Sequence, residues 1–88
     1  MGIRESAQEL DREVNDFLND EAPDNGAVLA AVFELNNEIG RVLRPTGNPA
    51  LRELQLDVNE VTKAAKVNDK ERLAKAMERI RARVVSLP

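Results

Sequence analysis

The chain has 88 residues, with 16 acidic and 13 basic side chains and a net charge of -3. It contains no cysteine, histidine, tryptophan or tyrosine, which excludes disulfides, thiolate or imidazole metal sites, haem held by histidine and histidine phosphotransfer. The length fits one domain, residues 1–88, and its core has to be aliphatic because the only aromatic residues are Phe17 and Phe33.

The first half of the chain predicts two helices, over residues 3–20 and 26–43. In each, apolar side chains recur every three or four residues, which places them along one stripe of a helix. The two stripes are Ile3, Ala7, Leu10, Val14 and Phe17, and then Val28, Val32, Leu35, Ile39 and Val42. Between them, Asp24 or Asn25 is placed to cap the second helix by accepting from its free amides.

Residues 44–48 read as a tight corner between antiparallel helices rather than as a linker between domains. Gly47 suits the positive φ of a turn, Asn48 is a good N-cap, and Pro49 suits the first helical position, where no amide hydrogen is needed. The third helix is predicted over 49–66, with the apolar stripe Leu51, Leu54, Val58, Val61 and Ala65.

A fourth helix is predicted over 69–86, although residues 50–87 contain no glycine or proline. The next apolar stripe begins at Leu73, one position out of phase with the third, and Asn68 with Glu71 reads as a capping box. The fold class is therefore all-α, a small antiparallel bundle of four short helices. The alternative is three helices, of which the last is long and bent.

Charge is distributed unevenly along the chain, because residues 1–40 hold ten acidic and two basic side chains, whereas residues 61–88 hold eight basic and three acidic ones. An acidic stripe on the first helix consists of Glu5, Glu9, Asp16 and Asp20, and a basic stripe on the last consists of Arg72, Lys75, Arg79 and Arg83. The preferred interpretation pairs these two stripes with each other across neighbouring antiparallel helices. The other interpretation is a phosphate-binding surface.

Reactive groups are few. The hydroxyls of Ser6, Thr46, Thr62 and Ser86 have no recognisable base beside them. The acidic stretch 20–26 lacks the spacing of a calcium loop, and the isolated glycines do not form a phosphate cradle. We therefore expect no enzymatic activity, no cofactor, no metal and no small-molecule substrate, and no apolar run is long enough for a membrane span.

The second helix is apolar over an unusually wide arc. Beside its main stripe it carries Leu29, Phe33, Asn36, Gly40 and Leu43. Gly40 in mid-helix indicates close approach of another backbone, and Asn36 is a candidate specificity contact. Leu56 lies on the polar side of the third helix. We take Leu29, Phe33, Asn36, Gly40 and Leu56 as candidate partner-binding residues. The simpler explanation is that the second helix packs between two others in the bundle.

These features predict a non-catalytic protein-interaction module: a small cytoplasmic adaptor, regulator or inhibitor that presents an apolar helical face to a protein partner or to a second copy in a homodimer. The first alternative is a nucleic-acid-binding regulator, with Arg72, Lys75, Arg79 and Arg83 on phosphates. The second is an inhibitor whose acidic first helix mimics nucleic acid.

Overall fold

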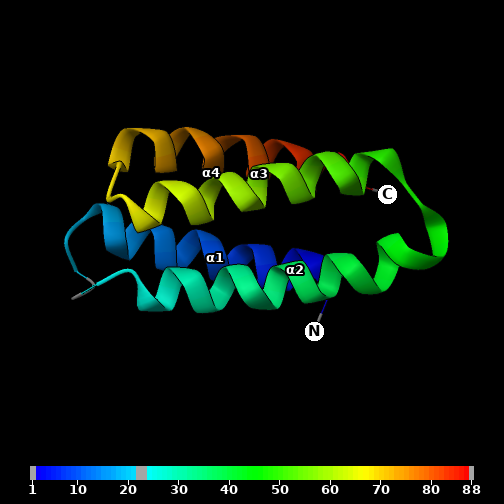
Figure 1. The fold of residues 1–88 in the computed structure, drawn as a ribbon, viewed down its shortest axis with the longest axis horizontal. Coiled ribbons are helices and arrows are strands. Elements are labelled where there is room, and N and C mark those ends of the chain that lie inside the picture. Colours follow the sequence, from blue (N-terminus) through cyan, green and yellow to red (C-terminus); the bar gives the residue numbers. More distant parts are fainter. Residues whose placement is uncertain (1, 22–23, 88) are drawn as a thin grey trace.

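The computed structural model describes residues 2–21 and 24–87, and within these residues all regular structure is helical (Figure 1). The helices are α1 (Ile3–Leu18), α2 (Gly26–Thr46), α3 (Pro49–Lys66) and α4 (Lys70–Val85). The prediction of an all-α fold with four helices is confirmed, and the alternative of one long bent helix after Pro49 is wrong.

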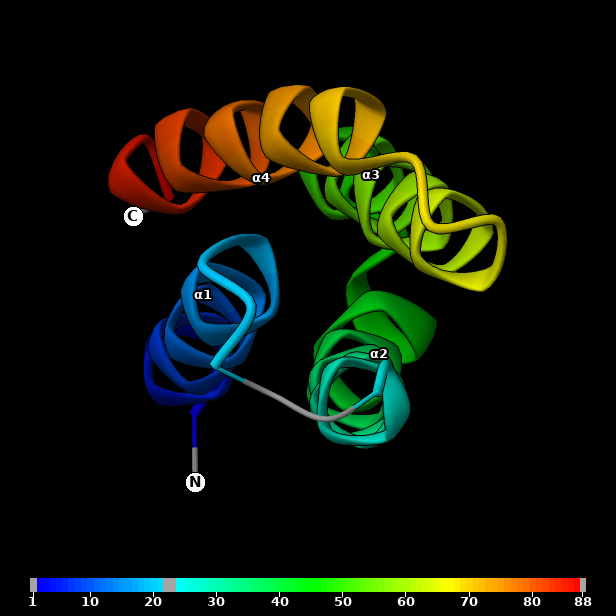
Figure 2. The same ribbon diagram turned by 90° about the vertical axis from the view of Figure 1, so that its left-hand side faces the viewer.

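The helices run alternately up and down around one core (Figures 1 and 2). In the end view of Figure 2, α1 lies between α2 and α4, and α3 occupies the opposite corner. The core consists of apolar side chains from all four helices, including Leu10, Val14, Leu35, Ile39, Leu54, Val58, Leu73 and Ile80, all with no exposed surface. Each buried leucine or isoleucine contributes about 1.5–3 kcal/mol, so burial of the four stripes holds the bundle together.

The corner between α2 and α3 forms as the sequence predicts. Gly47 has φ 61°, and the side chain of Asn48 accepts a hydrogen bond from the amide of Ala50 at 2.9 Å. Pro49 is the first residue of α3. α2 continues beyond its predicted end to Thr46, whose hydroxyl donates to the carbonyl oxygen of Val42 at 2.7 Å. The connection is therefore shorter than predicted, and α2 and α3 are held close together.

The turn between α3 and α4 lies where it was predicted, but Asn68 is not the cap. Asn68 adopts a left-handed conformation with φ 56°, and the amide of Asp69 donates to the carbonyl oxygen of Ala64 at 3.0 Å, which is a Schellman ending of α3. The side chain of Asp69 then accepts from the amide of Arg72 at 3.1 Å. The capping box was wrong by one residue because the left-handed residue occupies the position before the cap.

The start of α2 is fixed by two side chains with different roles. Asp24 accepts from the amide of Gly26 at 2.8 Å, but it precedes the N-cap residue, Asn25, whose side chain makes no cap hydrogen bond. Asn25 instead donates through its side-chain nitrogen to the carbonyl oxygen of Ala65 at 3.0 Å. This bond sets the level of α2 against α3, because it joins the beginning of one helix to the end of the other.

Candidate interaction surface

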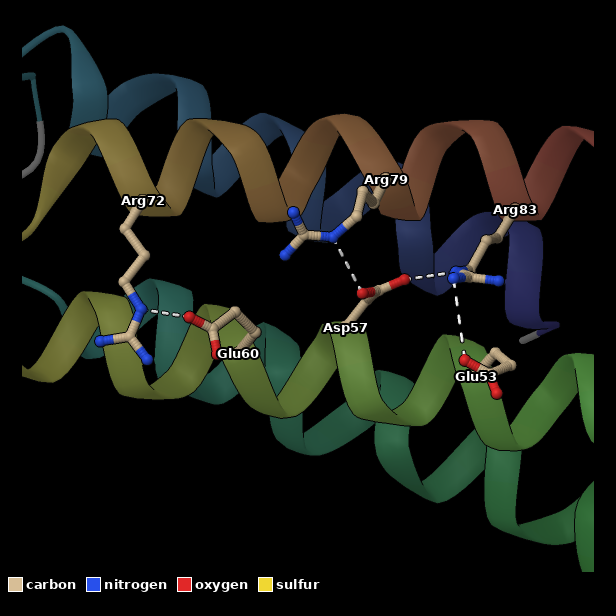
Figure 3. Close-up of polar contacts among 6 residues, drawn as sticks. All are labelled: Glu53, Asp57, Glu60, Arg72, Arg79 and Arg83. Atoms are coloured by element: carbon tan, nitrogen blue, oxygen red, sulfur yellow. Dashed lines mark hydrogen bonds and ion pairs between the residues drawn. The ribbon is translucent and has the colours of Figure 1, made fainter.

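The basic stripe of α4 faces α3, and most of its side chains form ion pairs with carboxylates of that helix (Figure 3). Asp57 lies between two arginines: it accepts from Arg79 at 3.1 Å and also from Arg83. Arg83 further approaches Glu53 at 3.8 Å, and Arg72 donates to Glu60. Lys75, the fourth member, contacts Glu71 of its own helix at 3.3 Å. The four predicted phosphate-binding residues all have carboxylate partners within the chain.

The contact between Glu60 and Arg72 changes the protonation equilibria of both groups. The hydrogen bond from Arg72 lowers the pKa of Glu60, and the partial burial of the carboxylate opposes this shift. The same hydrogen bond raises the pKa of Arg72 further above its already high value. Both groups are therefore charged at neutral pH, and the ion pair joins the edges of α3 and α4.

The expected pairing of the acidic stripe of α1 with the basic stripe of α4 is wrong. Arg81 of α4 donates to Asp11 of α1 at 2.6 Å, and Arg4 of α1 donates to the carbonyl oxygen of Leu87, just beyond α4, at 2.5 Å. Among the described residues, Asp20 is the one member of the predicted acidic stripe that forms an ion pair with α4, through Lys70. The two stripes belong to different interfaces.

The hand of the bundle explains this error. The predicted stripes lie just before core positions, for example Glu9 before Leu10 on α1 and Arg79 before Ile80 on α4. In the structure, the flank that carries Arg79 faces α3. The residues that lie one position after the core residues meet between α1 and α4. Asp11, which follows Leu10, and Arg81, which follows Ile80, form an ion pair there. Apolar periodicity is the same for both hands of a four-helix bundle, so the sequence pattern alone could not choose between them.

α1 and α2 enclose a shallow groove of about 470 Å³. Its lining consists of Ser6, Glu9, Glu13, Ala27, Ala30, Ala31 and Glu34. The alanines leave the groove open because their side chains are too short to reach across it. The hydroxyl oxygen of Ser6 is buried there without a hydrogen-bond partner among the described residues.

The other flank of α2 lies toward α3 and carries most of the predicted partner-binding residues. Leu29 is half-buried and packs against the core, as does Leu43. Asn36 and Gly40 are also half-buried. For Leu29, the simpler explanation of packing inside the bundle is therefore correct. Phe33 differs from its neighbours because 67% of its surface is exposed.

Gly40 was predicted to mark the close approach of another helix, but no helix of this chain approaches it closely among the described residues. A Cβ atom built at Gly40 would meet only the guanidinium group of Arg44, at 3.7 Å, which is an ordinary contact. The side-chain oxygen of Asn36, one turn earlier, is buried and has no hydrogen-bond partner within the part of the chain that the structure describes. Neither residue is accounted for by packing between α2 and α3.

Leu56 is 62% exposed on the outer side of α3, and it lies at nearly the same level as Phe33. Asn25 contacts Ala65, and eight residues along each antiparallel helix from this contact lead to Phe33 on α2 and to residue 57 on α3. We call the outer surface that these two helices share the α2–α3 face. Its residues are Phe33, Arg52, Leu56, Asn59, Lys63 and Lys66.

The sequence pattern pointed to Phe33 and Leu56 and placed Arg52 and Lys63 near Leu56, but these cations were not among the predicted partner-binding residues. Arg52, Leu56, Asn59 and Lys63 are spaced by four, three and four residues, which is the signal that was available, and all four are exposed. These cations were not singled out because the basic residues of α4 are more numerous and lie closer together in the sequence.

Comparison of the chain with models of known families, with curated proteins and with solved structures gave no match. Over the described residues, no helix combines the length and apolar character needed to cross a membrane. In the same residues, no three acidic side chains come together in a way that would hold a metal ion.

Proposed function

We propose that this protein is a non-catalytic interaction module that binds another protein through the α2–α3 face. The observation that supports this most strongly is the exposure of Phe33 and Leu56 at one level of two adjacent helices. In a chain with two phenylalanines, leaving one of them in water forgoes the burial energy of a large side chain. Aromatic and aliphatic anchors of this kind dominate the binding energy of protein interfaces.

The nucleic-acid alternative is less favoured by the contacts of α4. To bind phosphate, Arg79 and Arg83 would have to leave Asp57, whose side chain is only 11% exposed. That exchange would strand a mostly buried carboxylate without its partners, which is costly. The acidic-mimic alternative keeps one supporting observation, since Glu5, Glu9 and Asp16 have no ion pair with α4 among the described residues.

The test compares two pairs of exposed apolar residues. Phe33→Ser with Leu56→Ser removes the anchors of the α2–α3 face, and Val67→Ser with Val85→Ser removes two apolar residues exposed elsewhere. We expect cross-linking in native lysate to lose its protein adducts with the first double variant and to keep them with the second. Circular dichroism should show the same helix content for both, because all four side chains are exposed.

Self-association is tested with the same variants. If the partner is a second copy, sedimentation of the wild-type protein should show a concentration-dependent dimer, which the Phe33→Ser and Leu56→Ser double variant loses. Adducts that persist unchanged in this double variant, with no dimer in sedimentation, would remove the proposed function.

A further inference from the structure

We infer that the occupant of the α2–α3 face is an acidic amphipathic helix of another protein, a proposal that rests on the function proposed above. Three cations of α3 lie on this face on the same helix as Leu56: Arg52, Lys63 and Lys66. Within the described residues, none of the three has a carboxylate within ion-pair distance, unlike the arginines of α4. The protein is acidic overall, but this face is cationic.

The cause lies in how α3 distributes its charges. Its carboxylates Glu53, Asp57 and Glu60 all pair with arginines of α4, although Glu60 also attracts Lys63 at a distance beyond ion-pair contact. Its basic residues stand on the outer side, where Arg52 and Lys63 bracket Leu56 along one stripe. An occupant that buries Leu56 therefore brings its own charges close to unpaired cations.

The dimensions of the face set the length of the occupant. Arg52 and Lys63 are eleven residues apart, which is about 16 Å along the axis of α3. An occupant needs about three helical turns to reach both, with aliphatic residues at i, i+4 and i+7 against Phe33 and Leu56 and with Asp or Glu on the flanking positions. α1 of a second copy does not fit this description, because its apolar stripe, including Leu10 and Val14, is already buried.

The centre of the face distinguishes a peptide from a nucleic acid. Phosphate contacts need cations along the whole track of the backbone, whereas Leu56 lies between Arg52 and Lys63 on α3 and exposed Phe33 lies at nearly the same level on α2. Burying two large apolar side chains favours a partner with apolar side chains of its own. The three cations then act as a rim that selects for negative charge and steers association.

The test uses a displayed library of 18-residue helical peptides. Leucines are fixed at i, i+4 and i+7, and the flanking positions carry Asp, Glu, Lys, Arg, Ser or Gln at equal frequency. The library is depleted on the Phe33→Ser and Leu56→Ser double variant and then selected on the wild-type protein. We expect the enriched peptides to be net negative, and to bind an Arg52→Glu, Lys63→Glu and Lys66→Glu triple variant at least 10-fold more weakly than the wild type.

Each outcome separates this inference from the proposed function. Enriched peptides that are neutral or basic, or that bind the triple variant equally well, overturn the acidic partner and leave the interaction face intact. No enrichment over the depletion variant overturns the helical occupant, whereas the proposed function is decided by the cross-linking and sedimentation tests above. A 20-base-pair duplex that binds the wild type, is lost with the triple variant and is indifferent to Phe33→Ser and Leu56→Ser would also overturn the inference. Single Arg52→Glu and Lys63→Glu variants replace the triple variant if circular dichroism shows that it has lost helix.

Discussion

The interface between α3 and α4 and the interface between α1 and α2 are closed in different ways. α3 and α4 are joined along their outer edge by three carboxylates and three arginines, with Asp57 at the centre (Figure 3). Between α1 and α2, the described residues contain no ion pair, since Arg12 and Arg41 contact carboxylates of their own helices. The edge there is an open groove lined by alanines.

Both interfaces share the same core, so the difference lies in the residues that flank the apolar stripes. Long side chains of opposite charge reach across one edge, whereas short side chains leave the other edge open. Closing an edge therefore depends on the residues beside the stripe. Substitutions in the core should lower the stability of the fold at both interfaces. Substitutions at the edges should lower it at the α3–α4 interface but not at the α1–α2 interface.

The largest effect is expected where the two interfaces meet, in the shared core. Leu54 is fully buried on α3, and Leu54→Ala should lower the free energy of unfolding by about 3 kcal/mol through lost burial and a residual cavity. Leu56→Ala, two residues away on the same helix, should change it little because that side chain is exposed. Urea unfolding followed by circular dichroism measures both. Equal losses for the two variants would contradict the placement of α3.

Removal of the shared carboxylate should weaken the α3–α4 interface. Asp57→Asn keeps the shape of the side chain but leaves Arg79 and Arg83 without their common partner, and we expect a loss of about 2 kcal/mol, reduced from that of a fully buried pair because both arginines are partly exposed. Glu13→Gln is the matched control on α1, where the carboxylate forms an ion pair with Arg12 of its own helix. Urea midpoints that fall equally for both variants would remove the distinction between the two edges.

Filling the α1–α2 groove should act in the opposite direction. Ala30 lines this groove, and Ala30→Leu should raise the free energy of unfolding by about 0.5–1 kcal/mol by covering apolar surface that alanine leaves open. Ala74→Leu, at an exposed position of α4, controls for the change in residue type. Thermal unfolding should show a higher Tm for the first variant only. A lower Tm for Ala30→Leu would mean that the groove has no room for a larger side chain.

The fold could be predicted from the sequence because its signals are local. The four apolar stripes, the Gly47–Pro49 corner and the phase change before Leu73 each depend on residues close together in the chain. The end of α3 was misassigned at Asn68 because the same residue types serve both as left-handed helix endings and as caps.

The charge contacts could not be predicted because they depend on the hand of the bundle, which apolar periodicity does not encode. Exposure was partly predictable: Leu56 was identified from its position opposite the core stripe, whereas Phe33 and Leu29 looked equivalent in the sequence. Which of these two is buried depends on how far α2 is rotated toward α3. The helical spacing places Arg52 and Lys63 near Leu56, but only the structure shows that they lack ion-pair partners among the described residues, because the carboxylates of α3 pair with α4.

The smallest effect concerns pH and the Glu60–Arg72 pair at the end of the α3–α4 edge. Because the hydrogen bond from Arg72 lowers the pKa of Glu60 in the folded state, the pair stabilises the fold above the unfolded pKa of about 4.3 and loses this contribution as pH falls through the folded pKa. Wild type should therefore have a higher Tm than Glu60→Gln at pH 7, and the difference should shrink toward zero at pH 3. Glu34→Gln, beside the open groove, is the control and should give a smaller difference at pH 7. A Tm difference for Glu60→Gln that persists unchanged at pH 3 would show that the ionised pair does not stabilise this edge.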